Sequence, residues 1–270
     1  MRYFIPVLFL LCAVFARMDR FFFKQNESFC PSFILPKWSK CPQLKTKEPS
    51  LSPQELQALL SQPFTYLSKG NEFFAFSSKD NKWVIKFLHL SKSVRRFRVT
   101  HQKKSIQKLS LCLTSIKSAY EQLPTITNVA YAHLSPSDHL KQKILLIDKL
   151  GHSWEADLDA LPFVIQRKGT PYFTHFEKLN ASEKKALISD TIALFLNLYD
   201  NQLIDRDPIF SKNYGVYANK PFILDIGQLE KLDSLPTRSE YLRQMTRSLD
   251  CKLSFEDPEL HPFYLSQLSD

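Results

Sequence analysis

The stretch from Leu203 to Gly227 constrains this chain most, because it places acid and amide side chains on both sides of a predicted hairpin. An aspartate-bearing loop leads to Asn213, a short hairpin follows, and an apolar strand then ends in Asp225-Ile226-Gly227. Mg²⁺ takes hard oxygen ligands, and a Mg-nucleotide site uses only one or two protein carboxylates beside the phosphates. The pattern therefore predicts metal binding by Asn213 and Asp225. The alternatives are a turn role for Asn213 and a helix cap for Asp225.

A lysine lies inside the apolar run Trp83–Leu88, whose composition predicts a strand. Strand alternation places Val84 and Lys86 on the same face. A charged amine on a buried strand is costly unless it faces a cleft or a carboxylate. We therefore expect Lys86 to point into a ligand cleft, with Val84 on the wall of an adenine pocket.

The rest of the pattern combines strands with two long helices. An apolar stripe at helical spacing runs from Ile106 to Tyr120, and a second long helix begins at Asn180, whose side chain can cap it. A shorter helix is predicted from Ser52 to about Leu60. Strands are predicted between 64 and 88, with a turn at 78–81, and at roughly 126–133, 143–148 and 162–167. This content predicts an α+β fold.

These features together resemble the motifs of the protein-kinase-like fold. The D-I-G at 225–227 resembles the D-F-G triplet, and the D-R-D at 205–207 resembles H-R-D with aspartate in the histidine position. Asn213 resembles the catalytic-loop asparagine, and the V-I-K at 84–86 resembles the strand whose lysine grips the phosphates. The segment 67–76 lies where the phosphate-covering hairpin is expected.

The resemblance covers roughly residues 62–230 and implies a bilobal protein-kinase-like fold, with a β-rich N-lobe at 56–168 and a small helical C-lobe at 169–270. It implies ATP and Mg as cofactors. The implied nucleotide contacts are Gly70, Val84, Lys86 and Glu121, and the implied metal ligands are Asn213 and Asp225. The implied catalytic base is Asp207, which would position the acceptor hydroxyl, with Asp205 as its competitor. The spelling around these motifs also resembles a small uncharacterised chlamydial family of kinase-like proteins, which brings no established activity with it.

Several departures from the kinase pattern shape the expected function. The phosphate-covering hairpin holds only Gly70, and the proline after Asp207 makes a turn role its alternative. The predicted helix offers only Glu121, near its C-terminal end, as a partner for Lys86; the alternative is a solvated helix-end charge. Only 43 residues follow Gly227, too few for an evident peptide platform. We therefore expect a phosphotransferase acting on a small or lipid-linked hydroxyl, and the alternative is a catalytically weak pseudokinase that binds nucleotide or a partner.

The first 55 residues differ from the rest of the chain. Tyr3 to Ala16 is an apolar run of 14 residues, shorter than the roughly 20 that span a bilayer. For residues 1–23 a cleaved secretory signal, an uncleaved membrane anchor and neither of these remain open. Five prolines within 24–55 predict a linker.

Charge supports one partner prediction and composition excludes several classes of protein. The net charge is +9, and the segment 92–108 carries seven Lys or Arg and no acid. With residues 1–24 this suits an anionic membrane surface, the alternative being the solvated face of the predicted helix. The predicted location is cytoplasmic or membrane-associated at the cytoplasmic face, with secretion left open.

Five scattered cysteines predict reduced thiols, and the sequence lacks zinc-ligand spacing, H-E-x-x-H, G-x-S-x-G and a specific nucleic-acid motif. The oligomeric state stays open.

Overall fold

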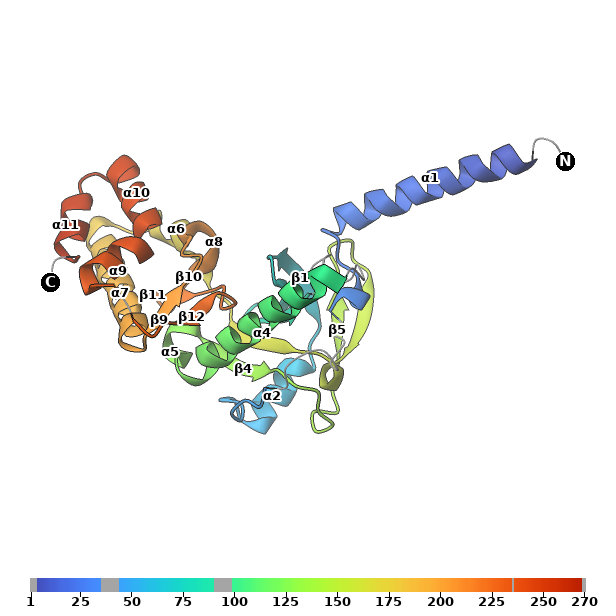
Figure 1. Cartoon of the computed structure of the whole chain (residues 1–270), viewed down its shortest axis with the longest axis horizontal. Coiled ribbons are helices and arrows are strands. Elements are labelled where there is room, and N and C mark those ends of the chain that lie inside the picture. The colour runs from blue at the N-terminus through green and yellow to red at the C-terminus, as the bar shows by residue number, and fades with distance from the viewer. Residues whose placement is uncertain (1–3, 35–43, 90–98, 235, 269–270) are drawn as a thin grey trace.

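The computed structural model describes residues 4–34, 44–89, 99–234 and 236–268, with side chains for all of these except 4–11 and 99–106. Helices and strands are mixed around a curled sheet that occupies the middle of the molecule (Figure 1). The C-terminal helices gather at one end, and the N-terminal helix projects from the other. The predicted mixture of helices and strands is confirmed, while its division into two lobes at residue 168 stays a prediction.

The main sheet has seven strands in the order β4-β7-β3-β2-β1-β5-β6. Their bounds are β1 Phe64–Lys69, β2 Phe73–Ser78, β3 Trp83–Leu88, β4 Val129–His133, β5 Lys143–Ile147, β6 Ser153–Asp157 and β7 Phe163–Arg167. β1 and β5 pair in parallel, and the other neighbours pair antiparallel. The predicted strands are confirmed, but β6 was missed because only Ala156 within it is buried, which leaves little apolar pattern to detect.

The central strands are the most deeply buried part of this sheet. Every residue of β2 is buried, and in β3 only Lys86 is partly exposed. The turn between them includes Asn81, which adopts a left-handed backbone with φ 62° that asparagine tolerates better than most residues. Lys86 is therefore the one polar interruption in a strand that is otherwise enclosed.

Two helices flank this sheet in the first half of the chain, and their predicted positions are confirmed. Helix α2, Pro53–Leu60, begins at Ser52, whose side chain forms a capping box with Glu55. Helix α4, Val99–Glu121, contacts β4 and reaches beyond the sheet (Figure 1). A short helix α5, Pro124–Thr127, links α4 to β4.

The second half of the chain is mainly helical, with two small sheets. A three-stranded sheet holds β8 Thr170–Pro171, β10 Tyr214–Tyr217 and β11 Lys220–Ile223, and a two-stranded sheet pairs β9 Leu203–Asp205 with β12 Leu229–Lys231. The helices are α6 Tyr172–Phe176, α7 Ala181–Asp200, α8 Phe210–Asn213, α9 Arg238–Met245, α10 Arg247–Glu256 and α11 His261–Ser266. Helix α7 begins with the predicted cap, because Asn180 and Glu183 form a capping box.

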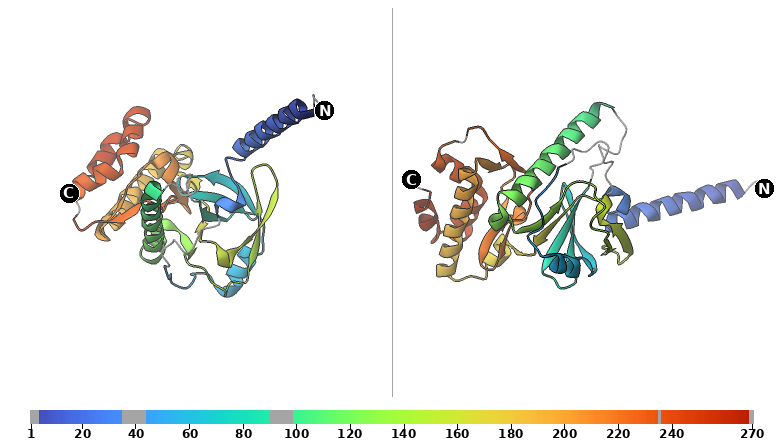
Figure 2. Two further views of the ribbon diagram at one scale, coloured as in Figure 1. Left: turned by 45° about the vertical axis from the view of Figure 1, so that its right-hand side comes forward. Right: turned by 90° about the horizontal axis from the view of Figure 1, so that it is seen from below.

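Helix α1, Phe4–Gln25, projects away from the sheet in every view (Figure 1; Figure 2). It ends at a tightly packed junction, in which Asn26 donates to Asp148 and Phe29 is 3% exposed. The Phe29 ring packs against the rings of Phe74 and Phe76. Among the residues that the structure describes, no helix is long and apolar enough to cross a membrane.

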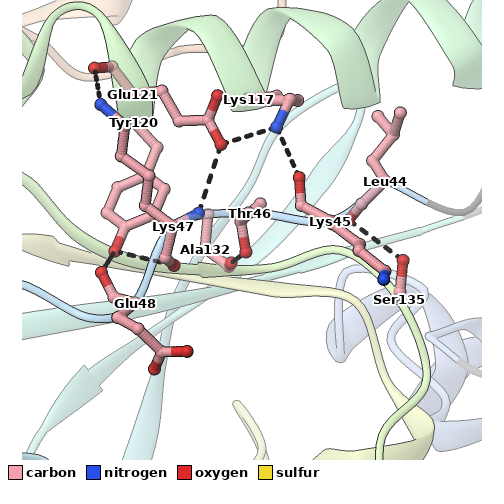
Figure 3. A network of polar contacts seen from close by, with 10 residues as sticks. All are labelled: Leu44, Lys45, Thr46, Lys47, Glu48, Lys117, Tyr120, Glu121, Ala132 and Ser135. Atoms are coloured by element: carbon pink, nitrogen blue, oxygen red, sulfur yellow. Dashed lines mark hydrogen bonds and ion pairs between the residues drawn. The ribbon is translucent and has the colours of Figure 1, made fainter.

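The described parts of the predicted linker 24–55 also pack against the core. Ile34 is buried beside the 3₁₀ turn η1, Pro31–Phe33. Beyond 35–43, which lie outside the described residues, the chain runs along β4, where Thr46 donates to Ala132 O (Figure 3). The prolines therefore lie in irregular backbone, and the described parts of that backbone pack against the core.

Candidate functional site

Lys86 of β3 is the first residue of the site. Its Nζ atom donates to the backbone oxygen of Leu224 at 2.5 Å, a contact that joins β3 to the end of the apolar segment before Asp225. Burial lowers the pKa of Lys86 to about 8, and the nearby charge of Asp225 partly offsets this effect. Lys86 thus faces the carboxylate segment that the sequence led us to expect.

The hairpin β10–β11 brings Asn213 and Asp225 together. The backbone N–H groups of Leu224 and Asp225 both donate to the backbone oxygen of Asn213, at 2.8 and 3.2 Å. Asp225 Oδ1 accepts from the Gly227 N–H at 3.1 Å, so the carboxylate is oriented by its own turn. The segment after Asp225 enters β12 and not a helix, which removes the helix-cap interpretation of Asp225.

Close packing, and not an unusual backbone angle, favours glycine at position 227. A Cβ atom there would lie 3.2 Å from the Phe73 ring and 3.3 Å from Cys112 Sγ. The chain after Asp225 lies pressed between β2 and α4.

Asn213 connects the hairpin to the preceding loop. Its Nδ2 atom donates to the backbone oxygen of Asp207 at 2.6 Å and to Asp207 Oδ2 at 3.0 Å. Asn213 is 6% exposed, and no donor among the described residues reaches its Oδ1 atom. An amide oxygen fixed in this way is a hard ligand of the kind that Mg²⁺ prefers, so Asn213 and Asp225 fit the metal that the sequence predicts.

Asp205 and Asp207 occupy different environments, although the sequence made them competitors. Asp205 is 2% exposed and accepts hydrogen bonds from the Tyr214 hydroxyl and, at 2.9 Å, from the Asp207 N–H. Burial raises the pKa of Asp205 to about 6, against the lowering effect of these hydrogen bonds. Asp207 is partly exposed. Asp205 therefore supports the loop, and Asp207 is the carboxylate that a ligand can reach.

The nucleotide contacts predicted for Gly70 and Val84 stay predictions. Gly70 is exposed in the β1–β2 connection, and its N–H donates to the Phe73 oxygen at 2.8 Å. A Cβ at Gly70 would meet only that oxygen, at 3.8 Å, so packing does not demand glycine. Val84 is buried on β3 opposite Gln166 of β7. Gln166 in turn donates to the Ile223 oxygen at 2.8 Å and ties the main sheet to β11.

Glu121 is not brought to Lys86. It ends α4 and binds Lys117 at 2.6 Å and the backbone N–H of Lys47 at 3.2 Å (Figure 3). The same network holds the Tyr120 hydroxyl against Glu48. Glu121 therefore fastens the helix end to the segment that runs along β4 and lies apart from the residues joined to Lys86.

Sequence reasoning missed four residues beside the Asp225 loop. Glu72 is buried, binds Lys108 of α4 at 2.8 Å and accepts from Gln228 at 3.0 Å. Ser115 of α4 contacts the backbone on both sides of Gly227. One signal was available, because Glu72 is the single acid between Glu55 and Asp80 and directly precedes a buried apolar run.

Within the described ranges, no group of three or more His, Cys, Asp or Glu side chains could hold a metal ion. A site built from Asn213, Asp225 and phosphate oxygens does not depend on such a group, because an amide and the nucleotide supply the other ligands. The residues therefore suit a metal that arrives with a nucleotide.

Comparison with known proteins gives a structural likeness only. No family model and no curated relative matches the chain. A crystal structure of WbdD with a kinase inhibitor is 10% identical with a TM-score of 0.44, covering 75% of this chain and 44% of that chain. A second WbdD structure is 13% identical with a TM-score of 0.43, covering 76% and 46%. A third, described as the bifunctional kinase-methyltransferase WbdD, is 11% identical with a TM-score of 0.39, covering 73% and 42%.

This chain thus spans less than half the length of those WbdD structures. At such scores and identities the likeness identifies neither a family nor an activity. Any functional assignment has to come from the geometry of this chain.

The predicted membrane contact stays a prediction. The described part of α1 exposes apolar side chains at helical spacing, with basic residues beside them. The apolar set is Val14, Phe15, Met18, Phe21 and Phe22, and the basic set is Arg17, Arg20 and Lys24. Of the segment 92–108, residues 92–98 lie outside the described residues, and Lys108 is paired with Glu72.

Proposed function

We propose that this protein is a protein-kinase-like phosphotransferase that uses Mg-ATP. One observation carries the proposal: a continuous chain of hydrogen bonds joins Lys86, Asn213, Asp225 and Asp207, which come from separate segments. A cation, two hard-oxygen ligands and a reachable carboxylate are the parts that phosphoryl transfer needs. Membership of the small chlamydial family of kinase-like proteins that the sequence resembles is part of this proposal.

Each of these residues has a proposed role. Lys86, protonated at neutral pH with its pKa at about 8, holds phosphate oxygens. Asn213 Oδ1 and the Asp225 carboxylate hold the metal, which when bound neutralises phosphate charge. Asp207 orients the acceptor hydroxyl, and Asp205 holds the Asp207 backbone in place. Gly70 and Val84 contact the nucleotide, whereas Glu121 is left out of the site.

The proposed acceptor is a small or lipid-linked hydroxyl. Helix α10 is attached to the loop that follows Asp207, because Ser248 accepts from the Phe210 N–H and donates to the Pro208 oxygen. Phosphoryl transfer in this fold depends mostly on positioning, so the acceptor is chosen by the surface around the Asp207 carboxylate. A short attached helix suits a pocket for a small group better than an extended platform for a peptide.

The test is Mg-ATP binding followed by phosphate release or transfer. We expect Mg-ATP to stabilise the wild type by about 2.7 kcal/mol at a hundredfold excess over its dissociation constant. Lys86→Met and Asp225→Asn remove that stabilisation, whereas the matched controls Lys82→Met and Asp233→Asn, both exposed, keep it. Absence of any Mg-ATP effect on the wild type contradicts nucleotide binding altogether. Binding without turnover supports the alternative, a pseudokinase that acts as a nucleotide-dependent binding module.

The acceptor is tested separately, with labelled ATP and three pools of protein, glycolipid and small metabolites. Label in the glycolipid or metabolite pool, lost in Asp225→Asn, supports the proposed acceptor class. Label confined to the protein pool contradicts that class while leaving the phosphotransferase in place.

A further inference from the structure

Glu72 is a buried carboxylate that joins three segments of the chain. It lies in the connection between β1 and β2, with its side chain 7% exposed. Its Oε1 atom is 2.8 Å from Lys108 Nζ on α4 and 3.0 Å from Gln228 Nε2, three residues after Asp225. We call Glu72, Lys108 and Gln228 the Glu72 bridge.

The loop that follows Asp225 is held a second time by α4. Ser115 Oγ donates to the Ile226 oxygen at 2.5 Å and accepts from the Leu229 N–H at 2.7 Å. Gly227, between these contacts, is packed against Cys112. Backbone and side-chain contacts therefore fix this loop on both sides of Gly227.

The acid that contacts the Asp225 loop comes from the connection between β1 and β2, and not from α4, because of how the charges are distributed. Helix α4 has Glu121 as its only acid, and Glu121 is bound at the far end. The helix instead contributes a cation, Lys108, and the hairpin contributes the acid. A carboxylate with little exposure is stable when it is paired and hydrogen-bonded, and Glu72 is both.

We propose that Glu72 is a positioning residue that holds the Asp225 loop against α4 and so places the Asp225 carboxylate for a nucleotide-bound metal. The inference rests on the proposed function for its metal and on the contacts above for its geometry. Outer partners of metal ligands govern affinity because they orient the ligand. Glu72 acts on Asp225 through Gln228 and the backbone of 226–228.

Two readouts test the inference, one of which needs no nucleotide. The first is the rate at which Cys112 is alkylated in the full chain, followed by mass spectrometry of its peptide. Burial raises the pKa of the Cys112 thiol, so its reaction depends on opening of the loop. Glu72→Gln, which keeps the side-chain shape but loses the charge, should raise this rate by about fivefold or more.

The second readout is the apparent dissociation constant for Mg²⁺ at saturating ATP. Glu72→Gln should raise it by about tenfold or more, with ATP binding in EDTA unchanged. The charge swap Glu72→Lys with Lys108→Glu should recover part of both effects. The matched control is Glu121→Gln, which breaks a similar ion pair on the same helix and should change neither readout.

The outcomes separate the inference from the proposed function. An unchanged alkylation rate in Glu72→Gln overturns the inference. Faster alkylation with unchanged Mg²⁺ affinity, in a wild type that binds Mg-ATP, also overturns it. Faster alkylation in a protein that never binds Mg-ATP contradicts the proposed function but supports the role of Glu72 in holding the loop.

Discussion

The C-terminal turn of helix α4 and its middle part are fastened in different ways. At the C-terminal end, Lys117, Tyr120 and Glu121 contact the backbone of the segment along β4 (Figure 3). In the middle part of the helix, Lys108 and Ser115 contact Glu72 and the loop after Asp225. The sequence placed the functional acid in the C-terminal turn, whereas the structure places the contacts with the site in the middle part.

This difference teaches that one helix can serve stability and positioning with separate residues. The C-terminal turn binds backbone groups of a segment that carries no site residue. The middle part binds the loop that orients Asp225, so a change there should affect ligand binding as well as folding. The predictions below separate these two effects.

The largest effect is expected for Ser115→Ala. The change leaves the Ile226 oxygen and the Leu229 N–H without their partner, and both residues are buried. An unsatisfied buried polar group costs roughly 1–3 kcal/mol, so the free energy of unfolding should fall by roughly 2–5 kcal/mol in urea titrations. Mg-ATP stabilisation should be lost as well. Ser118→Ala, one turn further along α4, is the control, and an equal loss there would contradict the special role of Ser115.

The next effect concerns the pH dependence of stability at Lys86. Its pKa is about 8 in the folded protein against an ordinary 10.5. Below pH 8 the folded state holds a desolvated charge, and between pH 8 and 10.5 the folded lysine is neutral while the unfolded one stays protonated. Stability supplied by this group therefore rises with pH across that window.

Lys86→Met removes the titrating group and should exceed the wild type in free energy of unfolding by roughly 3 kcal/mol at pH 7. The gap should shrink steadily up to pH 10. Urea titrations of both proteins at pH 7, 8, 9 and 10 measure it. A gap that stays constant over this range would show that Lys86 is not desolvated in the folded protein.

A smaller effect is expected for Tyr120→Phe in the C-terminal turn of α4. The tyrosine hydroxyl donates to the Glu48 oxygen at 2.5 Å. Its removal should lower the free energy of unfolding by about 1 kcal/mol. Because this contact does not reach the Asp225 loop, the Mg-ATP shift measured by thermal unfolding should match the wild type. A reduced shift would show that the C-terminal turn of α4 also affects nucleotide binding.

The smallest effect is expected for Glu121→Gln. Its partner Lys117 is about one-third exposed, at 34%. Such pairs contribute at most about 0.5–1 kcal/mol, so urea and thermal unfolding should change little. Nucleotide binding should be unaffected. A loss of Mg-ATP binding in this variant would show that Glu121 belongs to the nucleotide site after all, although its side chain is bound at the C-terminal end of α4.

The part of the site that was predictable from the sequence is the part made by local geometry. Asn213 and Asp225 are separated by one hairpin, and Lys86 is recognisable in the sequence as a charged residue within an apolar strand. The Glu72 contact to Gln228 spans 156 positions, and no local pattern reports such a distance. Lys108 was not predictable either, because it is one of seven basic residues in the segment 92–108 and the sequence does not distinguish it from the others.

The fold shows the same division between local and distant information. Capping boxes at Ser52 and Asn180 and the apolar strands were predictable, because each depends on a few neighbouring residues. The packing of Phe29 was not predictable, because prolines indicate irregular backbone and say nothing about burial. The different burial of Asp205 and Asp207 likewise depends on Tyr214, which returns to Asp205 only after the chain folds.

The packed junction at the base of α1 has a consequence for orientation. Helix α1 has 22 residues and is therefore about 33 Å long. Asn26 binds both Asp148 and the N–H of Lys149, so the base of this rod is fixed to the main sheet at more than one point. A surface that binds α1 therefore also fixes the orientation of the rest of the protein on that surface. The direction of α1 relative to the rest of the protein is therefore set by the packed junction and not by a loose linker.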